Sequence, residues 1–470
     1  MKHLFKIICM SALLFLCACE PENPVTPPPG DEEQVPDPPQ EKPEPEPVPV
    51  PVDYDVIVSA KLTFSYLDFE GTVNVPDRRI DFTMELYGDD APNLRYLPVT
   101  FELKDGYSIQ GTDKEYIRLI LSQEEPASVS FVKDDIVIDY DVYVSLVIKE
   151  APCTDFNMKS GVNLSYWFQE DIPWPDDVTV EQISGCGFDH VRLPFDSKVI
   201  FDSEGGIRRN HMDMLHDTVS KCLEEGLNVI LDMHWLVNGN LFYDEDAAEE
   251  LLNNWNRLME EFSGYPNERV AYEILNEPHG YGWEQMQRNM LHVIRSKEPG
   301  RVVFVSPQGY NAKAASEFTI HTGDPNIVIT FHYYEPMLAS HRKAWGYTGP
   351  SHYPGYLFSE DEWNAMSDAE KKQAQGQNNV WYDYDYTLAK FRSVVNNKSL
   401  NGLRVHCGEF GMSKTNIRSE RVQWFKDIVK AFNECDIAYT VWENWGGDFG
   451  PGNWASEPDE EIIDILLCRD

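Results

Sequence analysis

Basic residues are scarce in this sequence. Lysine and arginine together number 39 against 79 aspartates and glutamates, which gives a formal net charge of -40. A surface this acidic repels phosphate backbones and other polyanions, so nucleic acid and acidic polysaccharides are poor partners. The composition favours an uncharged ligand.

Several signatures of metal, disulfide and nucleotide sites are also missing. None of the 12 histidines lies in an HExxH pattern or in a tight cluster of ligands, so we expect no zinc site. The nine cysteines include no CxxC pair. Cys222, Cys407 and Cys435 fall within predicted helices or strands, which favours buried free thiols over a disulfide framework.

A membrane-directed pattern occurs only at the N-terminus. Lys2 and Lys6 precede an apolar run over residues 7–16, and Leu16-Cys17-Ala18-Cys19 follows. This pattern predicts a secretory signal over residues 1–18 that is too short to span a bilayer. Its last four residues resemble a bacterial lipobox, which implies a lipid on Cys19; a plain signal with incidental cysteines is the alternative. No other segment has 18 consecutive apolar residues, so the lipid would be the only membrane attachment.

Residues 19–52 are dominated by proline and acidic side chains. Proline fixes the backbone and like charges repel, so we expect an extended, semi-rigid tether. At about 3.1 Å per residue it would hold the folded part up to roughly 100 Å from the lipid. Such a tether suits a surface protein that faces a large external polymer, and a passive stalk fits the pattern equally well.

Residues 53–151 are predicted to form a small all-β domain. The segments 56–64, 80–86, 99–103 and 136–143 alternate apolar with polar residues. Period-two patterning between turn residues predicts an antiparallel, immunoglobulin-like β-sandwich. Its role is either glycan binding or, as the simpler interpretation, spacing.

Residues 152–470 change to an α/β pattern. Strands are predicted at 159–164, 190–193, 228–233, 270–275, 302–305, 327–331, 403–408 and 438–441, and helices between them include 212–225, 283–297 and 420–434. Eight strands alternating with helices predict a (β/α)8 TIM barrel, and no glycine-rich phosphate loop follows the first strand. An insertion rich in tyrosine and tryptophan occupies residues 335–401.

Polar side chains gather at the ends of the predicted strands, where the active site of such a barrel lies. In chain order they are Arg192, His234, Asn276, Glu277, His332, Tyr334 and Glu409, followed by Trp442. Glu277 and Glu409 would face each other across the barrel mouth, as glycoside hydrolysis requires. Arg192 would keep Glu409 ionised as a nucleophile, and desolvation of Glu277 would raise its pKa so that it stays a competent acid.

The other residues of this set are assigned to substrate binding. We expect the Asn276 amide to bind the sugar 2-hydroxyl and Tyr334 to donate a hydrogen bond to Glu409. His234 and His332 would bond to hydroxyls or orient the acid. Trp442 offers an apolar face for a pyranose ring. Further candidates for sugar stacking, with the first two favoured by their position next to the proposed site, are Trp235, Trp445, Trp167, Trp174, Trp345 and Trp454.

The segments around these residues resemble the signature segments of glycoside hydrolase family 5. They are VRLPF at 191–195, LNEP at 275–278, FHYY at 331–334 and GEFG at 408–411. The resemblance runs from residue 156 to the C-terminus. It implies a retaining mechanism with Glu277 as acid/base and Glu409 as nucleophile, no metal or other cofactor, and β-linked glucans or mannans as substrates. The leader, tether and added β domain are similar to those of Bacteroidetes outer-surface enzymes, which implies attachment to the outer membrane and exposure at the cell surface.

The sequence therefore predicts a monomeric, lipid-anchored endo-β-1,4-glycanase acting on a neutral polysaccharide. A glucan of the cellulose, mixed-linkage or xyloglucan type is the first expectation, and β-mannan is the nearest alternative. The insertion leaves open whether the cleft is capped at one end, and transglycosylation in place of hydrolysis also stays open. A surface glycan-binding protein without catalysis is the alternative from another class, against which the two retained carboxylates argue.

Overall fold

A computed structural model describes residues 52–88, 92–243, 245–320, 322–343, 346–453 and 457–469. The predicted signal, Cys19, the tether up to residue 51, Trp345 and Trp454 lie outside these ranges. Within them, no helix has the length and apolar character needed to cross a membrane. The six described cysteines are free thiols, and of the three expected to be buried Cys435 is partly exposed.

The N-terminal region is rich in β-structure. Its strands are β1 (Ile57–Phe64), β2 (Leu67–Asn74), β3 (Arg79–Tyr87), β4 (Leu97–Leu103), β5 (Ser108–Ile109), β6 (Tyr116–Leu119), β7 (Ala127–Lys133) and β8 (Ile136–Lys149). They are arranged in the order β5-β7-β8-β3-β2-β1-β4-β6. Alternate side chains of β3, from Ile80 to Leu86, are buried in one hydrophobic core, as the period-two pattern predicts.

The pairing of β3 with β8 corrects the prediction of a wholly antiparallel arrangement. These two strands run parallel, from Arg79 opposite Asp141 to Tyr87 opposite Lys149. The other neighbouring strands pair in the antiparallel sense. Alternation of apolar and polar residues determines which face of a strand is buried but carries no information about strand direction. The immunoglobulin-like class stays a prediction.

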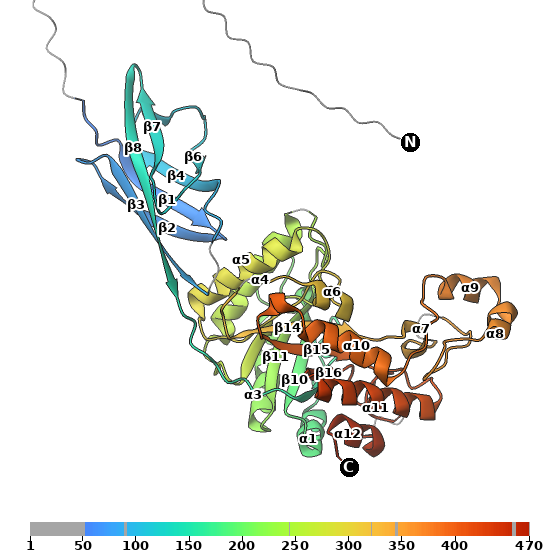
Figure 1. Cartoon of the computed structure of the whole chain (residues 1–470). Helices are drawn as coiled ribbons and strands as arrows, with labels where there is room; N and C mark the ends of the chain where they lie inside the picture. The colour runs from blue at the N-terminus through green and yellow to red at the C-terminus, as the bar shows by residue number, and fades with distance from the viewer. Residues whose placement is uncertain are drawn as a thin grey trace, which may run out of the picture. The chain divides into compact units, whose positions relative to one another are not determined.

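The C-terminal region is a closed parallel barrel, which confirms the predicted (β/α)8 fold (Figure 1). Its strands are β9 (Ser160–Asn163), β10 (His190–Asp196), β11 (Asn228–Trp235), β12 (Val270–Glu273), β13 (Val303–Val305), β14 (Ile327–Tyr333), β15 (Arg404–Phe410) and β16 (Ala438–Val441). Each strand pairs with the next, and β16 closes the barrel on β9. The strands are almost entirely buried because helices cover the outer face and side chains fill the inside.

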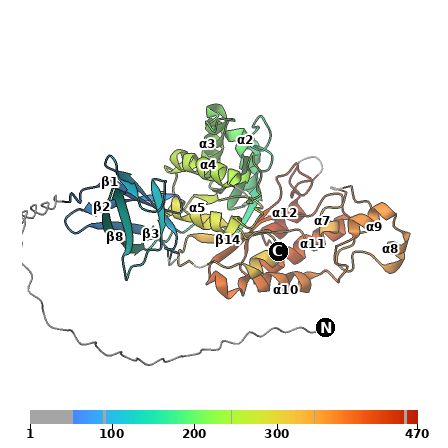
Figure 2. The ribbon, with the colours of Figure 1, turned by 90° about the horizontal axis from the view of Figure 1, so that it is seen from above.

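Helices surround the barrel strands in both views of the molecule (Figures 1 and 2). They are α1 (Asp177–Cys186), α2 (Ser197–Ile200), α3 (Arg209–Glu224), α4 (Asp246–Phe262), α5 (Trp283–Lys297), α6 (Ala312–Glu317), α10 (Tyr384–Val395), α11 (Arg418–Glu434) and α12 (Glu460–Leu466). In α3 the residues Met212, Leu215, Val219 and Cys222 are buried, which is the helical spacing expected of a core-facing stripe.

The insertion between β14 and β15 folds into short helices. They are α7 (Met337–Ser340), α8 (Glu360–Ala365), α9 (Asp368–Ala374) and the 3-10 helix η1 (Lys398–Leu400), with α10 between the last two. Capping boxes formed by Ser359 with Glu362 and by Ser367 with Glu370 start α8 and α9. In both views α8 and α9 lie side by side at the outer end of the insertion (Figure 2).

The inward-facing side chains change from apolar to polar along the barrel axis. Toward the amino ends of the strands, Ile230, Ala271, Phe304 and Val328 form an apolar layer with Phe156. Two residues further along β11 and β12 the same inner faces present Asp232 and Glu273, since side chains on one face of a strand are two residues apart. The barrel therefore collects buried ionisable groups at the carboxyl ends of its strands.

Candidate active site

The Arg192 guanidinium is fully buried at the centre of the barrel mouth. It bonds both oxygens of Glu273, with Nε to Oε2 at 2.8 Å and Nη2 to Oε1 at 2.9 Å. Nη2 also lies 2.9 Å from Oδ2 of Asp232, and Nη1 lies 2.9 Å from Oε1 of Glu409. Burial opposes the charge of Arg192, but the carboxylates of Asp232 and Glu273 raise its pKa well above the ordinary value. One cation thus orders three acidic groups.

Glu409 follows Gly408 near the end of β15 and is 5% exposed. Its Oε1 accepts a hydrogen bond from Arg192, and its Oε2 accepts one from the Tyr334 hydroxyl at 2.9 Å. A Cβ at position 408 would lie 3.2 Å from Nε2 of His332, so glycine leaves room for the imidazole. The register of β14 on β15 shifts just before His332, which places that residue opposite Glu409.

Glu277 lies in the loop after β12 with φ at 42°, and its side chain is 25% exposed. Its Oε1 lies 2.8 Å from Nδ1 of His332. Burial raises the pKa of Glu277 above the ordinary value, and His234, Arg192 and a hydrogen bond from Tyr310 only partly offset this rise. Glu277 therefore holds its proton more readily than an ordinary glutamic acid.

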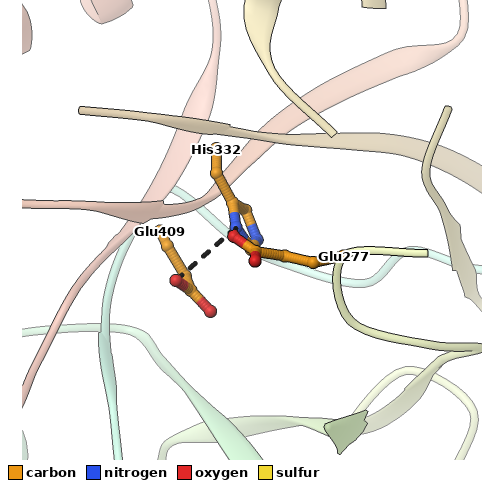
Figure 3. Close-up of side chains that lie close together, drawn as sticks. All are labelled: Glu277, His332 and Glu409. Carbon is orange, nitrogen blue, oxygen red and sulfur yellow. Dashed lines mark hydrogen bonds and ion pairs between the residues drawn. The ribbon is translucent and has the colours of Figure 1, made fainter. Parts of the chain in front are cut away.

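His332 lies between the two glutamates, and the three side chains point toward one another (Figure 3). Its Nδ1 is 2.8 Å from Glu277 and 3.5 Å from Oε2 of Glu409. Burial lowers the pKa of His332 to about 4, so the imidazole is uncharged near neutral pH. One donor atom from each of the three residues lies within 4.8 Å of the others. In the described part of the chain, this group has the donor types and spacing to hold a metal ion, because imidazole and carboxylate are both metal ligands.

Asn276, His234 and Trp442 complete the set that the structure brings together. Oδ1 of Asn276 accepts a hydrogen bond from Nη2 of Arg192 at 2.9 Å. The ring of His234 lies nearly parallel to that of Trp442, with centroids 5.6 Å apart. Nδ1 of His234 lies 2.7 Å from Asp232, and burial lowers the His234 pKa to about 4. Eight of the ten predicted site residues, including both glutamates, thus belong to one connected cluster. A ninth, Trp235, lies at the strand end beside it.

Trp445 does not join them, and its proposed stacking role needs correction. Its side chain is 2% exposed and packs against Phe188, with centroids 6.2 Å apart, so no ring face is free for a sugar. The closeness of Trp445 to Trp442 in the sequence does not determine whether the Trp445 ring points into the core or toward the active site. Trp167 is likewise buried, whereas Trp174 and Trp235 are about half exposed.

Sequence reasoning assigned no role to three buried side chains that hold Arg192. They are Asn163, Asp232 and Glu273. Burial raises the pKa of Asp232 to about 7, and Oδ1 of this residue has no hydrogen-bond partner. The sequence did contain a signal for two of them, because Asp232 and Glu273 each lie in a mostly apolar predicted strand. A charged side chain in a strand that is covered on both faces needs a partner.

Comparison with known proteins places this geometry in a family. A family model described as Cellulase (glycosyl hydrolase family 5) matches residues 149–448. Endoglucanase C of Acetivibrio thermocellus is 25% identical over 343 residues, which cover 67% of this chain and 99% of that protein. Cellodextrinase A of Ruminococcus flavefaciens is 23% identical over 332 residues, which cover 66% of this chain and 93% of that protein. The xyloglucan-specific endo-beta-1,4-glucanase BoGH5A of Bacteroides ovatus is 25% identical over 303 residues, which cover 54% of this chain and 55% of that protein.

Solved structures share the same fold. Endoglucanase Cel5A of Thermotoga maritima has a TM-score of 0.54 at 19% sequence identity, covering 66% of this chain and 96% of its own. A hyperthermophilic endo-beta-1,4-glucanase, solved in complex with substrate, has a TM-score of 0.54 at 22% identity, covering 66% of this chain and 97% of its own.

Proposed function

Because this chain belongs to the cellulase family, glycosyl hydrolase family 5, we propose that it cuts internal β-1,4 bonds of a neutral β-glucan with retention of configuration. Membership of the family makes it a glycosyl hydrolase of the endoglucanase type. The proposal adds the stereochemistry, the polymer and the residues that carry each step.

The spacing of Glu277 and Glu409 is the observation that carries the proposal. Oxygen atoms of the two carboxyl groups lie within 4.8 Å of each other. Retaining glycosidases hold their two carboxyl groups about 5–5.5 Å apart, whereas inverting enzymes need roughly 6.5–9.5 Å to admit a water molecule. The short separation supports direct attack by one carboxylate on the sugar.

In the first step Glu409 attacks the anomeric carbon while Glu277 gives its proton to the glycosidic oxygen. The carbon–oxygen bond of the glycoside breaks, an ester forms on Glu409, and the leaving chain departs with a new hydroxyl group. In the second step Glu277, now ionised, takes a proton from water. The resulting attack on the anomeric carbon breaks the ester and regenerates both residues.

The surrounding contacts fit these roles. Arg192 and Tyr334 each donate to one oxygen of Glu409, which aligns the nucleophile. Burial raises the pKa of Glu277, which suits a group that must begin the reaction protonated. The Asn276 amide is assigned to the sugar 2-hydroxyl, where hydrogen bonds strengthen in the transition state. Trp442 and the exposed Trp235 are assigned to the faces of sugar rings.

A glucan is the preferred substrate because relatives that match most of the catalytic region carry endoglucanase and cellodextrinase names. One relative is named for xyloglucan. β-Mannan is the nearest alternative. The net charge of -40 suits any neutral polymer and does not choose among them.

A panel of neutral polysaccharides with products resolved by size tests the proposal. It should include cellulose derivatives, mixed-linkage glucan, xyloglucan and β-mannan. We expect early products of intermediate length from one glucan, and no products from Glu409→Gln under the same conditions. Equal release of reducing ends by the wild type and Glu409→Gln would contradict an active hydrolase, and preferential cutting of mannan would move the substrate to the alternative.

We further propose that a lipid on Cys19 anchors the enzyme to the outer membrane with the catalytic region facing outward. The lipobox-like ending of the leader and the proline-rich tether support this location. Cells expressing the full chain should carry it in the membrane fraction and lose it to added protease without lysis. The Cys19→Ala variant should leave the membrane fraction; an unchanged distribution would contradict lipid attachment.

A further inference from the structure

Glu277 has a backbone conformation that residues other than glycine rarely adopt. Its φ of 42° lies in the left-handed region, which is unfavourable for a side chain with a Cβ. Such a conformation persists only where the surrounding structure holds it in place, and it is found most often at functional sites. The contacts on either side of Glu277 therefore determine where the proposed acid points.

Asn240, in the loop after β11, bonds the chain on both sides of Glu277. Before Glu277, its amide Nδ2 donates to the carbonyl of Asn276 at 2.6 Å. After Glu277, the backbone N–H of His279 donates to the carbonyl of Asn240 at 2.8 Å. The Asn276 carbonyl belongs to the planar peptide group that joins Asn276 to Glu277, so holding this oxygen also holds the plane from which the Glu277 backbone turns.

The pairing of the strands does not do this work. The register of β12 on β11 ends with Glu273 opposite Asp232, before the chain reaches Glu277. One further backbone bond, from Asn276 N to Met233 O at 2.9 Å, continues the pairing. Beyond it the chain turns away from β11, and the Asn276 carbonyl takes its hydrogen bond from the Asn240 side chain instead.

The Asn240 side chain is itself held in one orientation. The residue is 1% exposed, and both of its polar side-chain atoms have partners. Nδ2 donates to the carbonyl of His234 at 2.8 Å as well as to Asn276, and Oδ1 accepts from the backbone N–H of Leu236 at 3.1 Å. A buried network with its hydrogen bonds made is rigid, and losing one partner leaves the other groups unpaired.

We propose that Asn240 is a positioning residue that orients the Glu277 carboxyl group toward the glycosidic oxygen. This inference rests on the proposed function, in which Glu277 is the acid/base. Asn240 acts through the backbone of Asn276 and Glu277 and does not touch the substrate. Because proton transfer requires the acid to lie within hydrogen-bond reach of the oxygen, loss of Asn240 should slow the reactions that need this proton.

Two substrates separate this role from a structural one. Cellopentaose needs a proton on its leaving oxygen, whereas a dinitrophenyl β-cellobioside releases an acidic phenol without one. Asn240→Ala should lower kcat/KM on cellopentaose by at least about tenfold, since a small misplacement of a reacting group is costly. On the aryl cellobioside kcat/KM should stay within about twofold of the wild type, because the first step there needs no acid. A merely structural role would lower both values equally.

A double-mutant cycle tests whether the effect passes through Glu277. On cellopentaose, the variant with both Glu277→Ala and Asn240→Ala should match Glu277→Ala alone to within about twofold, because no acid is left to orient. A further loss as large as that in the wild-type background would show that Asn240 acts by another route, and would overturn the role.

Two variants control for the loss of a buried amide. Asn240→Leu fills the space that alanine leaves but offers no donor, so it should show the same difference between the two substrates. Asn228→Ala removes another buried asparagine, at the opposite end of β11, whose amide donates to a backbone carbonyl outside the site at 2.8 Å. It should lower the melting temperature and leave the ratio of the two kcat/KM values unchanged.

The outcomes distinguish this inference from the proposed function. If the wild type hydrolyses both substrates and Asn240→Ala lowers both equally or neither, the positioning role is wrong and the proposed function stands. If neither Asn240 variant folds, Asn240 is a structural residue and the role is overturned as well. If the wild type hydrolyses neither substrate, the proposed function fails and this inference fails with it.

Discussion

Nη1 of Arg192 lies 2.9 Å from Oε1 of Glu409, although the two residues come from strands that are not neighbours in the barrel. The guanidinium reaches across the mouth because its remaining nitrogen atoms are fixed by Asp232 and Glu273 on the next two strands. The same cation thus supports the fold and aligns the proposed nucleophile.

Arg192→Ala should therefore cost stability as well as activity. Removing the cation leaves Asp232 and Glu273 buried without their partner, and breaking such a buried pair costs about 3–5 kcal/mol of unfolding free energy. Urea unfolding measures the loss. Arg209→Ala is the matched control, because Arg209 pairs with Glu261 in an exposed setting and its loss should cost at most about 1 kcal/mol. Equal stability of the two variants would contradict the central role of Arg192.

Tyr334→Phe should lower catalysis while leaving the fold intact. The variant keeps the ring, which packs against His341 with centroids 4.8 Å apart, and removes only the hydroxyl that donates to Glu409. Hydrogen bonds to charged groups are worth about 1.5–3 kcal/mol, so kcat/KM should fall roughly 10- to 100-fold. Tyr333→Phe, which removes a hydroxyl bonded to Thr387, should leave kcat/KM unchanged. Similar kinetic losses in the two variants would argue against a specific role for Tyr334.

Glu277→Ala should discriminate between leaving groups. Natural glucans need a proton on the glycosidic oxygen, so their hydrolysis should fall by about 10²–10⁴-fold. Aryl glycosides with acidic phenols leave without that proton and should form the glycosyl-enzyme at a rate much closer to that of the wild type. Burst kinetics of phenol release measures this step. An equal loss on both substrate types would remove Glu277 from the acid role.

The pH dependence of kcat/KM on glucan should report the same group. Burial raises the pKa of Glu277, and the acid acts only while protonated. Activity should therefore fall as the pH rises through this pKa, at a pH above the value of about 4.3 for an ordinary glutamic acid. His332 does not account for such a fall near neutral pH, since burial lowers its pKa to about 4 and it is already uncharged there. An alkaline fall that persists in Glu277→Ala would assign it to another residue.

The sequence predicts the barrel well because its strands are fully covered. Runs such as Asn228–Met233 are apolar apart from Asn228 and Asp232, and the structure extends this strand only to Trp235. The strand ends then locate Arg192, Glu277 and Glu409 at one mouth, since all strands of the barrel are parallel. Strand direction in the N-terminal region was not predictable, because β3 and β8 alternate in the same way whichever direction they run.

The contacts that refine the site come from side-chain orientation and loop pairing, which the residue pattern does not encode. The burial of Trp445 depends on the path of the chain after β16. The partners of Arg192 include residues of four different strands, β9, β11, β12 and β15, and only the closed barrel brings them together. The pairing of the loops after β11 and β12 likewise depends on hydrogen bonds, such as that from the Tyr281 hydroxyl to the carbonyl of Tyr243.

Trapping of the glycosyl-enzyme tests the central claim most directly. A 2-deoxy-2-fluoro-β-cellobioside with an activated leaving group should inactivate the enzyme and add one fluorinated cellobiosyl group, a disaccharide, which peptide mass spectrometry should locate on Glu409. The account predicts this label and its absence in Glu409→Gln. A label on another residue, or no label together with products of inverted configuration, would contradict it.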